Sequence, residues 1–381
     1  MEFNTRRKSS IWGSVDLVAL ANIVFIMLLG ILLLASAGAG VAEKLKLPSY
    51  YFFKKQLVFL VLGMGIILFL ISLSEKSIRR IVLLGFISTT ALLVLVIFFG
   101  DATKGAKRWL NVFGFSLQPS EFLKPFYTCF LAIILSHANA KVNLKTFSIC
   151  IFFNIIVAGL LLLQPDFGMT VVNTMATFAL LFIAGIKLSW VLVMFVFFIC
   201  SVYVAYLCFP HVASRVNKFI NPVDSSNYQV QKSLSSYLDG GLFGKGPGEG
   251  TIKYNLPDAH TDFIFAVGAE EFGVIFCLLI MLTFAIFILR GFWGLTKLTN
   301  LFHIYASFGI LLHFAMQFLF NIGVTLNLFP TKGMTLPFIS YGGSSMIAFS
   351  IAAGIYLNLS SKKHVANSVV AKKFVFIQDK Y

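Results

Sequence analysis

Residues 17–34 read Leu-Val-Ala-Leu-Ala-Asn-Ile-Val-Phe-Ile-Met-Leu-Leu-Gly-Ile-Leu-Leu-Leu, an almost unbroken apolar stretch. A helix that crosses the hydrocarbon core of a bilayer needs about 20 mostly apolar residues, so this stretch is close to one transmembrane span. Comparable stretches recur along the chain, at residues 15–37, 51–74, 80–99, 118–136, 146–163, 167–187, 188–208, 263–289, 301–330 and 337–360. The pattern predicts an all-α polytopic membrane protein of about ten transmembrane helices, forming a single integral membrane domain over residues 1–381.

Two of these stretches depart from the simple pattern. The fourth contains Glu121, Lys124 and Pro125, which lower its hydropathy. Because Glu121 and Lys124 lie three residues apart, they share one face of a helix, and the cost of charge in lipid predicts that this face points into the bundle. The ninth stretch is longer than a bilayer requires, so we expect it to be tilted or to protrude.

The composition excludes an ordinary soluble protein. Of the 381 residues, 58% are hydrophobic and only 12% are charged, whereas soluble domains carry about 25% charged residues. A net charge of +15 would suggest nucleic-acid binding in a soluble protein. Here the basic residues form short clusters between apolar stretches, such as Arg79-Arg80 and Lys107-Arg108. Such clusters are typical of chains beside anionic headgroups, so we expect membrane lipid as a partner and no nucleic acid.

The distribution of Lys and Arg weakly favours an orientation with both termini in the cytoplasm and residues 361–381 as a cytoplasmic tail. Residues 209–262 then form a large extracytoplasmic loop between helices seven and eight. Several basic residues fall on the outer side, against the usual tendency: Lys104, Lys107, Arg108, Arg215 and Lys332. They either anchor the chain at the interface beside Trp109 or bind an anionic group such as a lipid diphosphate.

Three further polar strings interrupt the apolar pattern. In Gln164-Pro165-Asp166-Phe167-Gly168, Asp166 either caps the sixth helix, pairs with an outer cation or lines a cavity with Gln164. Tyr228-Gln229-Val230-Gln231 lies in the long loop. The run Gly240–Gly250 contains six glycines in eleven residues, but it lacks the spacing of nucleotide-binding motifs. It predicts a flexible or close-packed loop.

The string His260-Thr261-Asp262 precedes the eighth apolar stretch. A carboxylate at this position either caps the helix or acts as an acid–base group at the mouth of the bundle. Glu270 and Glu271 follow about 12–14 Å further along at 1.5 Å per residue. Three carboxylates on one membrane helix predict a polar cavity around them.

The last polar string, Pro337-Phe338-Ile339-Ser340-Tyr341-Gly342-Gly343, enters the tenth apolar stretch. Non-helical backbone at this depth is tolerated only within protein or around a cavity, so Ser340 and Tyr341 are candidate cavity residues. The chain has no CxxC or HExxH motif, so nothing indicates a structural metal.

Together these strings resemble the SEDS (shape, elongation, division, sporulation) family. The matching strings, in the family's order, are Lys107-Arg108-Trp109 to Pro125, Gln164 to Gly168, Tyr228 to Gln231, Gly240 to Gly250, His260 to Phe265 and Pro337 to Gly343. Within the family, the segments Gly246 to Gly250 and Leu256 to His260 resemble the division-type members more than the elongation-type members.

The resemblance implies a SEDS-type fold of ten helices that polymerises lipid II, a disaccharide-pentapeptide on undecaprenyl diphosphate, at the division septum. It implies partners in the nascent glycan, a class B penicillin-binding transpeptidase and other division proteins, and a place in the bacterial cytoplasmic (inner) membrane. Asp262 matches the family's essential acidic residue. We expect it to act as general base in an inverting glycosyl transfer, while the outer cations, or a divalent cation such as Mg²⁺ or Mn²⁺, stabilise the leaving diphosphate.

Three alternatives remain open from the sequence. Polar residues within spans and helices broken by Gly or Pro are also typical of transporters, which keeps a lipid II flippase possible. The chain could also be an elongation-type polymerase. A non-catalytic scaffold that recruits the transpeptidase would leave Asp262 and the outer cations without a purpose.

Overall fold

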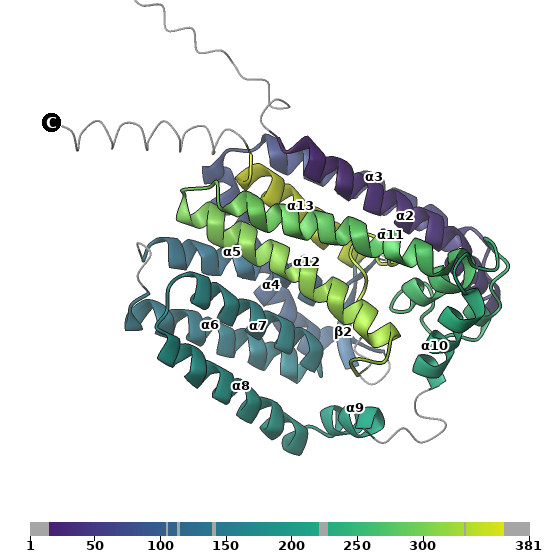
Figure 1. Ribbon diagram of the computed structural model, residues 1–381. Helices are drawn as coiled ribbons and strands as arrows, with labels where there is room; N and C mark the ends of the chain where they lie inside the picture. Colours follow the sequence, from purple (N-terminus) through teal and green to yellow (C-terminus); the bar gives the residue numbers. More distant parts are fainter. Residues whose placement is uncertain are drawn as a thin grey trace, which may run out of the picture.

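Helices make up nearly all the regular structure in the computed structural model (Figure 1). The structure describes residues 15–103, 106–112, 115–138, 142–220, 228–330 and 333–361. In chain order the elements are α2 (Leu17–Lys44), α3 (Tyr51–Ser72), α4 (Glu75–Phe99), β1 (Asp101–Thr103), β2 (Ala106–Val112), β3 (Phe115–Leu117), α5 (Pro119–Ser136), α6 (Leu144–Leu163), α7 (Phe167–Ile183), α8 (Leu188–Cys208), α9 (Pro210–Ile220), α10 (Tyr228–Gly240), the 3₁₀ turn η1 (Ile252–Tyr254), α11 (Ile264–Leu295), α12 (Leu301–Thr325) and α13 (Gly343–Leu359).

Each of the ten predicted spans corresponds to a helix in the described part of the chain. Seven are long and apolar enough to cross a membrane by length and composition, namely α2, α3, α4, α6, α8, α11 and α12. Two shorter apolar helices, α7 and α13, join them, and α5 is the tenth. Many large apolar side chains on these helices are exposed, including Phe98, Phe99 and Leu289, which in a membrane face lipid. The prediction of a polytopic all-α membrane protein is therefore confirmed.

The weak hydropathy of α5 has a structural reason. This helix packs against α4, α12 and α13, and 13 of its 18 residues are buried, Glu121 and Lys124 included. Because protein rather than lipid surrounds α5, its charged groups meet polar partners and not hydrocarbon.

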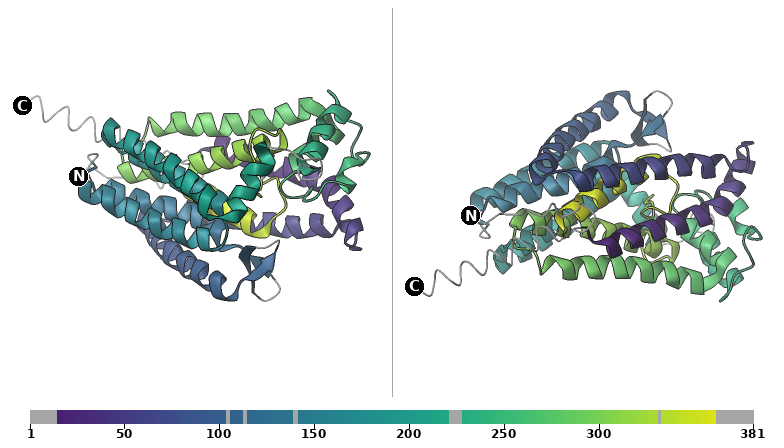
Figure 2. Two further views of the ribbon diagram at one scale, coloured as in Figure 1. Left: turned by 90° about the horizontal axis from the view of Figure 1, so that it is seen from below. Right: turned by 90° about the horizontal axis from the view of Figure 1, so that it is seen from above.

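The elements outside the apolar helices gather at one end of the bundle. Figures 1 and 2 place α9, α10 and the small sheet at the same end. The sheet has the order β1-β2-β3, with both pairs antiparallel. These elements were not predicted, because strands of three to seven residues and amphipathic helices of 11 and 13 residues give weak sequence signals.

Several helix boundaries differ from the prediction. The ninth span is shorter than predicted, since α12 ends at Thr325. The first helix continues to Lys44. The last helix begins only at Gly343, because residues 333–342 contain Pro337 and remain non-helical.

The eighth predicted span is a helix in two parts. At Gly273 the backbone has φ of 82° and ψ of 175° inside α11, so residues 264–272 and 274–295 are separate helical segments. This φ favours glycine, and a Cβ here would collide with the carbonyl oxygen of Leu242. The break leaves backbone groups on both sides that need partners from elsewhere.

Candidate functional site

The backbone of residues 260–262 is bound by three donors from two other parts of the chain. The backbone N–H of Tyr341 donates to the carbonyl of His260 at 2.9 Å. The hydroxyl of Ser340 donates to the carbonyl of Thr261 at 2.5 Å. The side-chain amide of Asn321, on α12, donates to the carbonyl of Asp262 at 2.9 Å. Three consecutive carbonyls are thus satisfied by α12 and by the turn before α13.

Asp262 is not the N-cap residue of the helix that follows it. The N-cap position of α11 is Phe263, which has no capping side chain, so the capping interpretation of Asp262 is wrong. A Cβ built at Gly333 would lie 3.5 Å from Oδ2 of Asp262. The carboxylate therefore lies against the start of the 333–342 segment, whose neighbour in the chain is Lys332.

Aromatic and amide groups surround this segment on its other side. The ring of His260 lies 4.7 Å from that of Phe52 and 5.5 Å from that of Tyr341, measured between centroids. Gln56, buried on α3, donates to the carbonyl of Ser340 at 3.4 Å. The structure therefore brings the predicted residues His260, Ser340 and Tyr341 together and adds α3 to the site.

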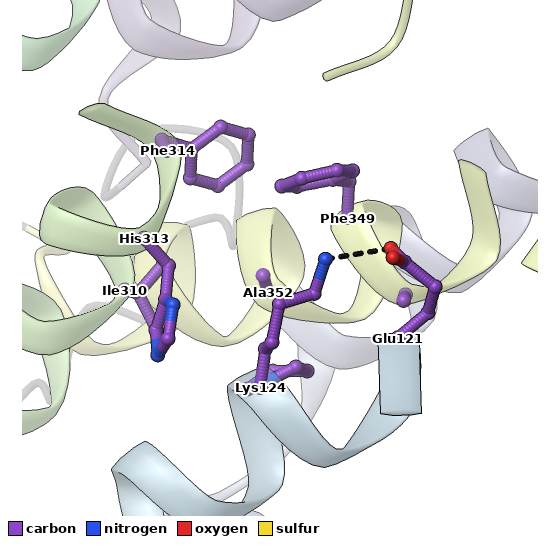
Figure 3. A pocket seen from close by; sticks show the side chains of 9 residues that line it. Glu121, Lys124, Ile310, His313, Phe314, Phe349 and Ala352 are labelled. Carbon is purple, nitrogen blue, oxygen red and sulfur yellow. Dashed lines mark hydrogen bonds and ion pairs between the residues drawn. The ribbon is translucent and has the colours of Figure 1, made fainter. Parts of the chain in front are cut away.

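A second polar cluster lies inside the bundle around Lys124 (Figure 3). Its ammonium donates to Glu121 at 2.6 Å and to Gln317 of α12 at 2.8 Å, which confirms that the Glu121–Lys124 face points inward. His313 shares a hydrogen bond of 2.7 Å with the hydroxyl of Thr128. A cavity of about 10 Å³ lies between Lys124 and His313, room for about one water molecule.

One face of α12 connects both clusters and was missed by the sequence analysis. His313, Gln317 and Asn321 are spaced four residues apart, so they lie on one side of the helix. All three are buried. Polar residues at this spacing inside an apolar stretch are a signal that would have found them.

Arg108 is bound within the fold. Its guanidinium donates to the carbonyls of Gln164, at 3.3 Å, and Pro165, and it lies 3.7 Å from the carboxylate of Asp166. Asp166 also caps α7 by accepting from the N–H of Met169 at 3.3 Å. Asp166 thus serves two of the alternatives predicted for it, the cap and the cation pair. The Gln164 amide donates to the carbonyl of Leu93 at 2.8 Å.

Replacing Arg108 with Met is expected to lower the free energy of unfolding by about 1–3 kcal/mol, because buried acceptors lose their donor. Lys107→Met is the matched control, since Lys107 is exposed, and its effect is expected to stay within about 0.5 kcal/mol. Thermal unfolding in detergent micelles measures both. Equal shifts for the two variants would contradict the structural role of Arg108.

Glu270 and Glu271 bind the glycine-rich loop, which we define as residues 241–251. Glu270 accepts from the N–H groups of Thr251, at 2.8 Å, and Ile252. Glu271 accepts from the N–H of Gly248 at 3.1 Å. The polar cavity predicted around these carboxylates is therefore wrong, because a close-packed loop supplies the donors.

Two lysines, which the sequence analysis did not single out, complete this arrangement. Lys253 is 2% exposed, and its ammonium lies 2.7 Å from the carboxylate of Glu271 and 2.9 Å from the hydroxyl of Ser36 on α2. Lys245 lies nearer the surface and bonds Asp239 at 2.9 Å and Glu270 at 3.3 Å. The hydrogen bond to Asp239 holds the pKa of Lys245 above its usual value.

The same loop satisfies the break in α11. The N–H groups of Lys245 and Gly246 donate to the carbonyls of Glu270 and Glu271, and those of Val274 and Ile275 donate to the carbonyls of Gly241 and Leu242. These are the groups that a helix break leaves open. The loop thus fixes the far end of the 264–272 segment, whose near end follows Asp262.

The remaining predicted site residues lie as follows. Lys107 is exposed on β2, Gln229 is half-buried on α10 and Gln231 is exposed there. Lys104 and Lys332 lie outside the described residues, as does the side chain of Arg215 on α9. In the described part of the chain, no three His, Cys, Asp or Glu side chains are grouped to hold a metal ion, and the divalent cation stays a prediction.

The helices, the buried charge clusters and the bound backbone at Asp262 define a multi-pass membrane protein with a polar site at one end of its bundle. Residues 17–365 match the family model described as cell cycle protein, which covers FtsW, RodA and SpoVE. The chain therefore belongs to this family, which confirms the resemblance found in the sequence.

Two relatives match this sequence over nearly its whole length. A probable peptidoglycan glycosyltransferase FtsW of Caulobacter vibrioides is 36% identical over 353 residues, covering 92% of this chain and 90% of the relative. The corresponding protein of Coxiella burnetii is 36% identical over 368 residues, covering 93% and 98%.

Solved structures share the fold. A chain from a study titled as the structural coordination of polymerization and crosslinking by a peptidoglycan synthase complex matches with a TM-score of 0.74 and 25% identity, covering 91% of this chain and 97% of that one. The rod shape determining protein RodA of Thermus thermophilus matches with a TM-score of 0.69 and 26% identity, covering 92% and 97%.

Proposed function

We propose that this protein is a peptidoglycan glycosyltransferase of the FtsW type, which polymerises lipid II into glycan strands with Asp262 as general base. The relatives named as FtsW glycosyltransferases support the activity. The observation that carries the residue assignment is the position of the Asp262 carboxylate beside Gly333, on a backbone whose two flanking peptide carbonyls accept from Ser340 and Asn321. A carboxylate fixed in this way is suited to proton transfer.

In the proposed reaction, the 4-hydroxyl of one sugar attacks the anomeric carbon of another, which carries the diphosphate. Asp262 removes the hydroxyl proton as the new C–O bond forms, and undecaprenyl diphosphate leaves with inversion of the anomeric centre. Cations near the leaving group stabilise its growing negative charge. Lys332 is our first candidate, because it adjoins Gly333, which lies beside Asp262 in the structure.

The other outer cations are candidates for the same role to different degrees. Lys107 is exposed and accessible, and Lys104 and Arg215 carry charge at the same predicted side. Arg108 is less suited, because two carbonyls and Asp166 already occupy its guanidinium.

The proposed setting is the cytoplasmic membrane at the division site, with both termini in the cytoplasm and residues 209–262 outside. The proposed partner is a class B penicillin-binding transpeptidase, within a larger set of division proteins. The shared fold with a chain of a peptidoglycan synthase complex supports a partner of this kind.

The test is a polymerisation assay on the complex. The chain is purified with its transpeptidase, the transpeptidase active site is blocked with a β-lactam, and lipid II is supplied. Glycan polymer on a gel is the expected result. Movement of labelled lipid II across vesicles without polymer would establish a flippase instead, and neither activity would favour a scaffold.

A further inference from the structure

Asn321 makes the contacts expected of a residue that orients the site from a distance. Its side chain is 1% exposed. The amide nitrogen donates to the carbonyl of Asp262 at 2.9 Å and to that of Met334 at 2.6 Å. One side chain therefore ties α12 to both the Asp262 backbone and the 333–342 segment.

Ser340 binds the backbone on the N-terminal side of Asp262. Its hydroxyl donates to the carbonyl of Thr261 at 2.5 Å and accepts from the N–H of Leu336 at 2.8 Å. Thr261 provides the carbonyl of the peptide group before Asp262, and Asp262 provides the carbonyl of the peptide group after it. Ser340 and Asn321 thus hold the two peptide planes that flank the α-carbon of Asp262.

We propose that Asn321 and Ser340 are positioning residues for the Asp262 carboxylate, an inference that rests on the proposed role of Asp262 as base. Two fixed peptide planes determine the φ and ψ angles of Asp262 and hence the direction of its Cα–Cβ bond. The residue needs such support, because it lies outside α11, which begins at Ile264.

The position of a general base strongly affects the rate of the reaction, since a displacement of about 1 Å can lower that rate about 10²-fold. Neither positioning side chain needs to touch substrate for this effect. The inference also explains why a buried amide occurs at Asn321, within an apolar helix that otherwise packs against α11 and α5.

The primary test compares Asn321→Leu with Asn358→Leu. Asn358 is the matched control, because it is also buried and its amide also donates to backbone carbonyls, those of Leu70, Ile71 and Leu73 at the end of α3. Per folded enzyme, Asn321→Leu is expected to lower kcat by about 10- to 100-fold with the KM for lipid II nearly unchanged. Asn358→Leu is expected to lower only the melting temperature.

Ser340 supplies an independent pair of variants if Asn321→Leu fails to fold. Ser340→Ala removes the hydroxyl donor and is expected to lower kcat, whereas Ser340→Thr keeps the hydroxyl and is expected to recover most of it. Equal activity of the Ala and Thr variants would overturn the assignment of Ser340.

A double-mutant cycle separates positioning from general damage. In an Asp262→Ala background the carboxylate is absent, so Asn321→Leu is expected to leave the residual rate unchanged. A further loss equal to that in the wild type would overturn the positioning role. If Asp262→Ala alone kept wild-type activity, the proposed base would be wrong. If Asp262→Ala were inactive while Asn321→Leu had normal kcat, only the present inference would fail.

Discussion

Asp262→Asn is expected to lower the rate of glycan polymerisation by about 10²–10⁴, the usual contribution of a general base. The amide keeps the size and polarity of the carboxylate but cannot take a proton from the attacking hydroxyl. Because the hydrogen bonds that hold the backbone here use carbonyl groups and not the carboxylate, the loss of charge is expected to leave the melting temperature nearly unchanged. Polymerisation of lipid II by the purified complex, normalised to folded protein, gives the rate.

Asp258→Asn is the control for this substitution. Asp258 lies four residues earlier in the same segment and has a φ of 57°, a conformation that Asn tolerates. Its variant is expected to polymerise at close to the wild-type rate. Similar losses in both variants would show a general need for negative charge in this segment and contradict the assignment of Asp262.

Lys253→Met is expected to destabilise the protein by about 3–5 kcal/mol, the usual result when one partner of a buried ion pair is removed. Lys253 and Glu271 are 2% and 1% exposed, so the carboxylate would remain charged and buried. Ser36 and the carbonyl of Gly248 would also lose their donor. The melting temperature in detergent, and protease cleavage within the glycine-rich loop, measure the effect.

Two further variants identify the cause. Lys245→Met is the matched control, because Lys245 is 33% exposed in its side chain and Glu270 keeps its donors from Thr251 and Ile252. Lys245→Met is expected to lower the free energy of unfolding only slightly. Adding Glu271→Gln to Lys253→Met removes the unpaired charge and is expected to restore part of the stability. If the double variant were no more stable than Lys253→Met, burial of charge would not be the cause.

The two charge clusters differ in how far the sequence could predict them. Glu121 and Lys124 are three residues apart on one helix, so their ion pair at 2.6 Å follows from helical spacing alone. The partner of Glu271 is Lys253, and the hydroxyl beside both belongs to Ser36, far earlier in the chain. No local pattern connects those positions, which is why a cavity was predicted in place of a bound loop.

The break in α11 shows a similar limit. Hydropathy reads residues 264–295 as one continuous span, because the segment is long and contains a strongly apolar stretch. Gly273 permits the break, but the hydrogen bonds from the glycine-rich loop stabilise it. The sequence contained both segments without any local sign that they pair.

The sequence by itself determined the number of apolar helices, the buried face of α5 and Asp262 as the candidate base, which also depended on the family resemblance. Apolar length and helical spacing are local properties, and they remain readable before the chain folds. Only the tertiary structure decided how Asp262 is held, through Asn321, Ser340 and the N–H of Tyr341. Those donors come from residues 59 or more positions later in the chain than their acceptors, and hydrogen bonds between distant segments form only when packing brings the segments together.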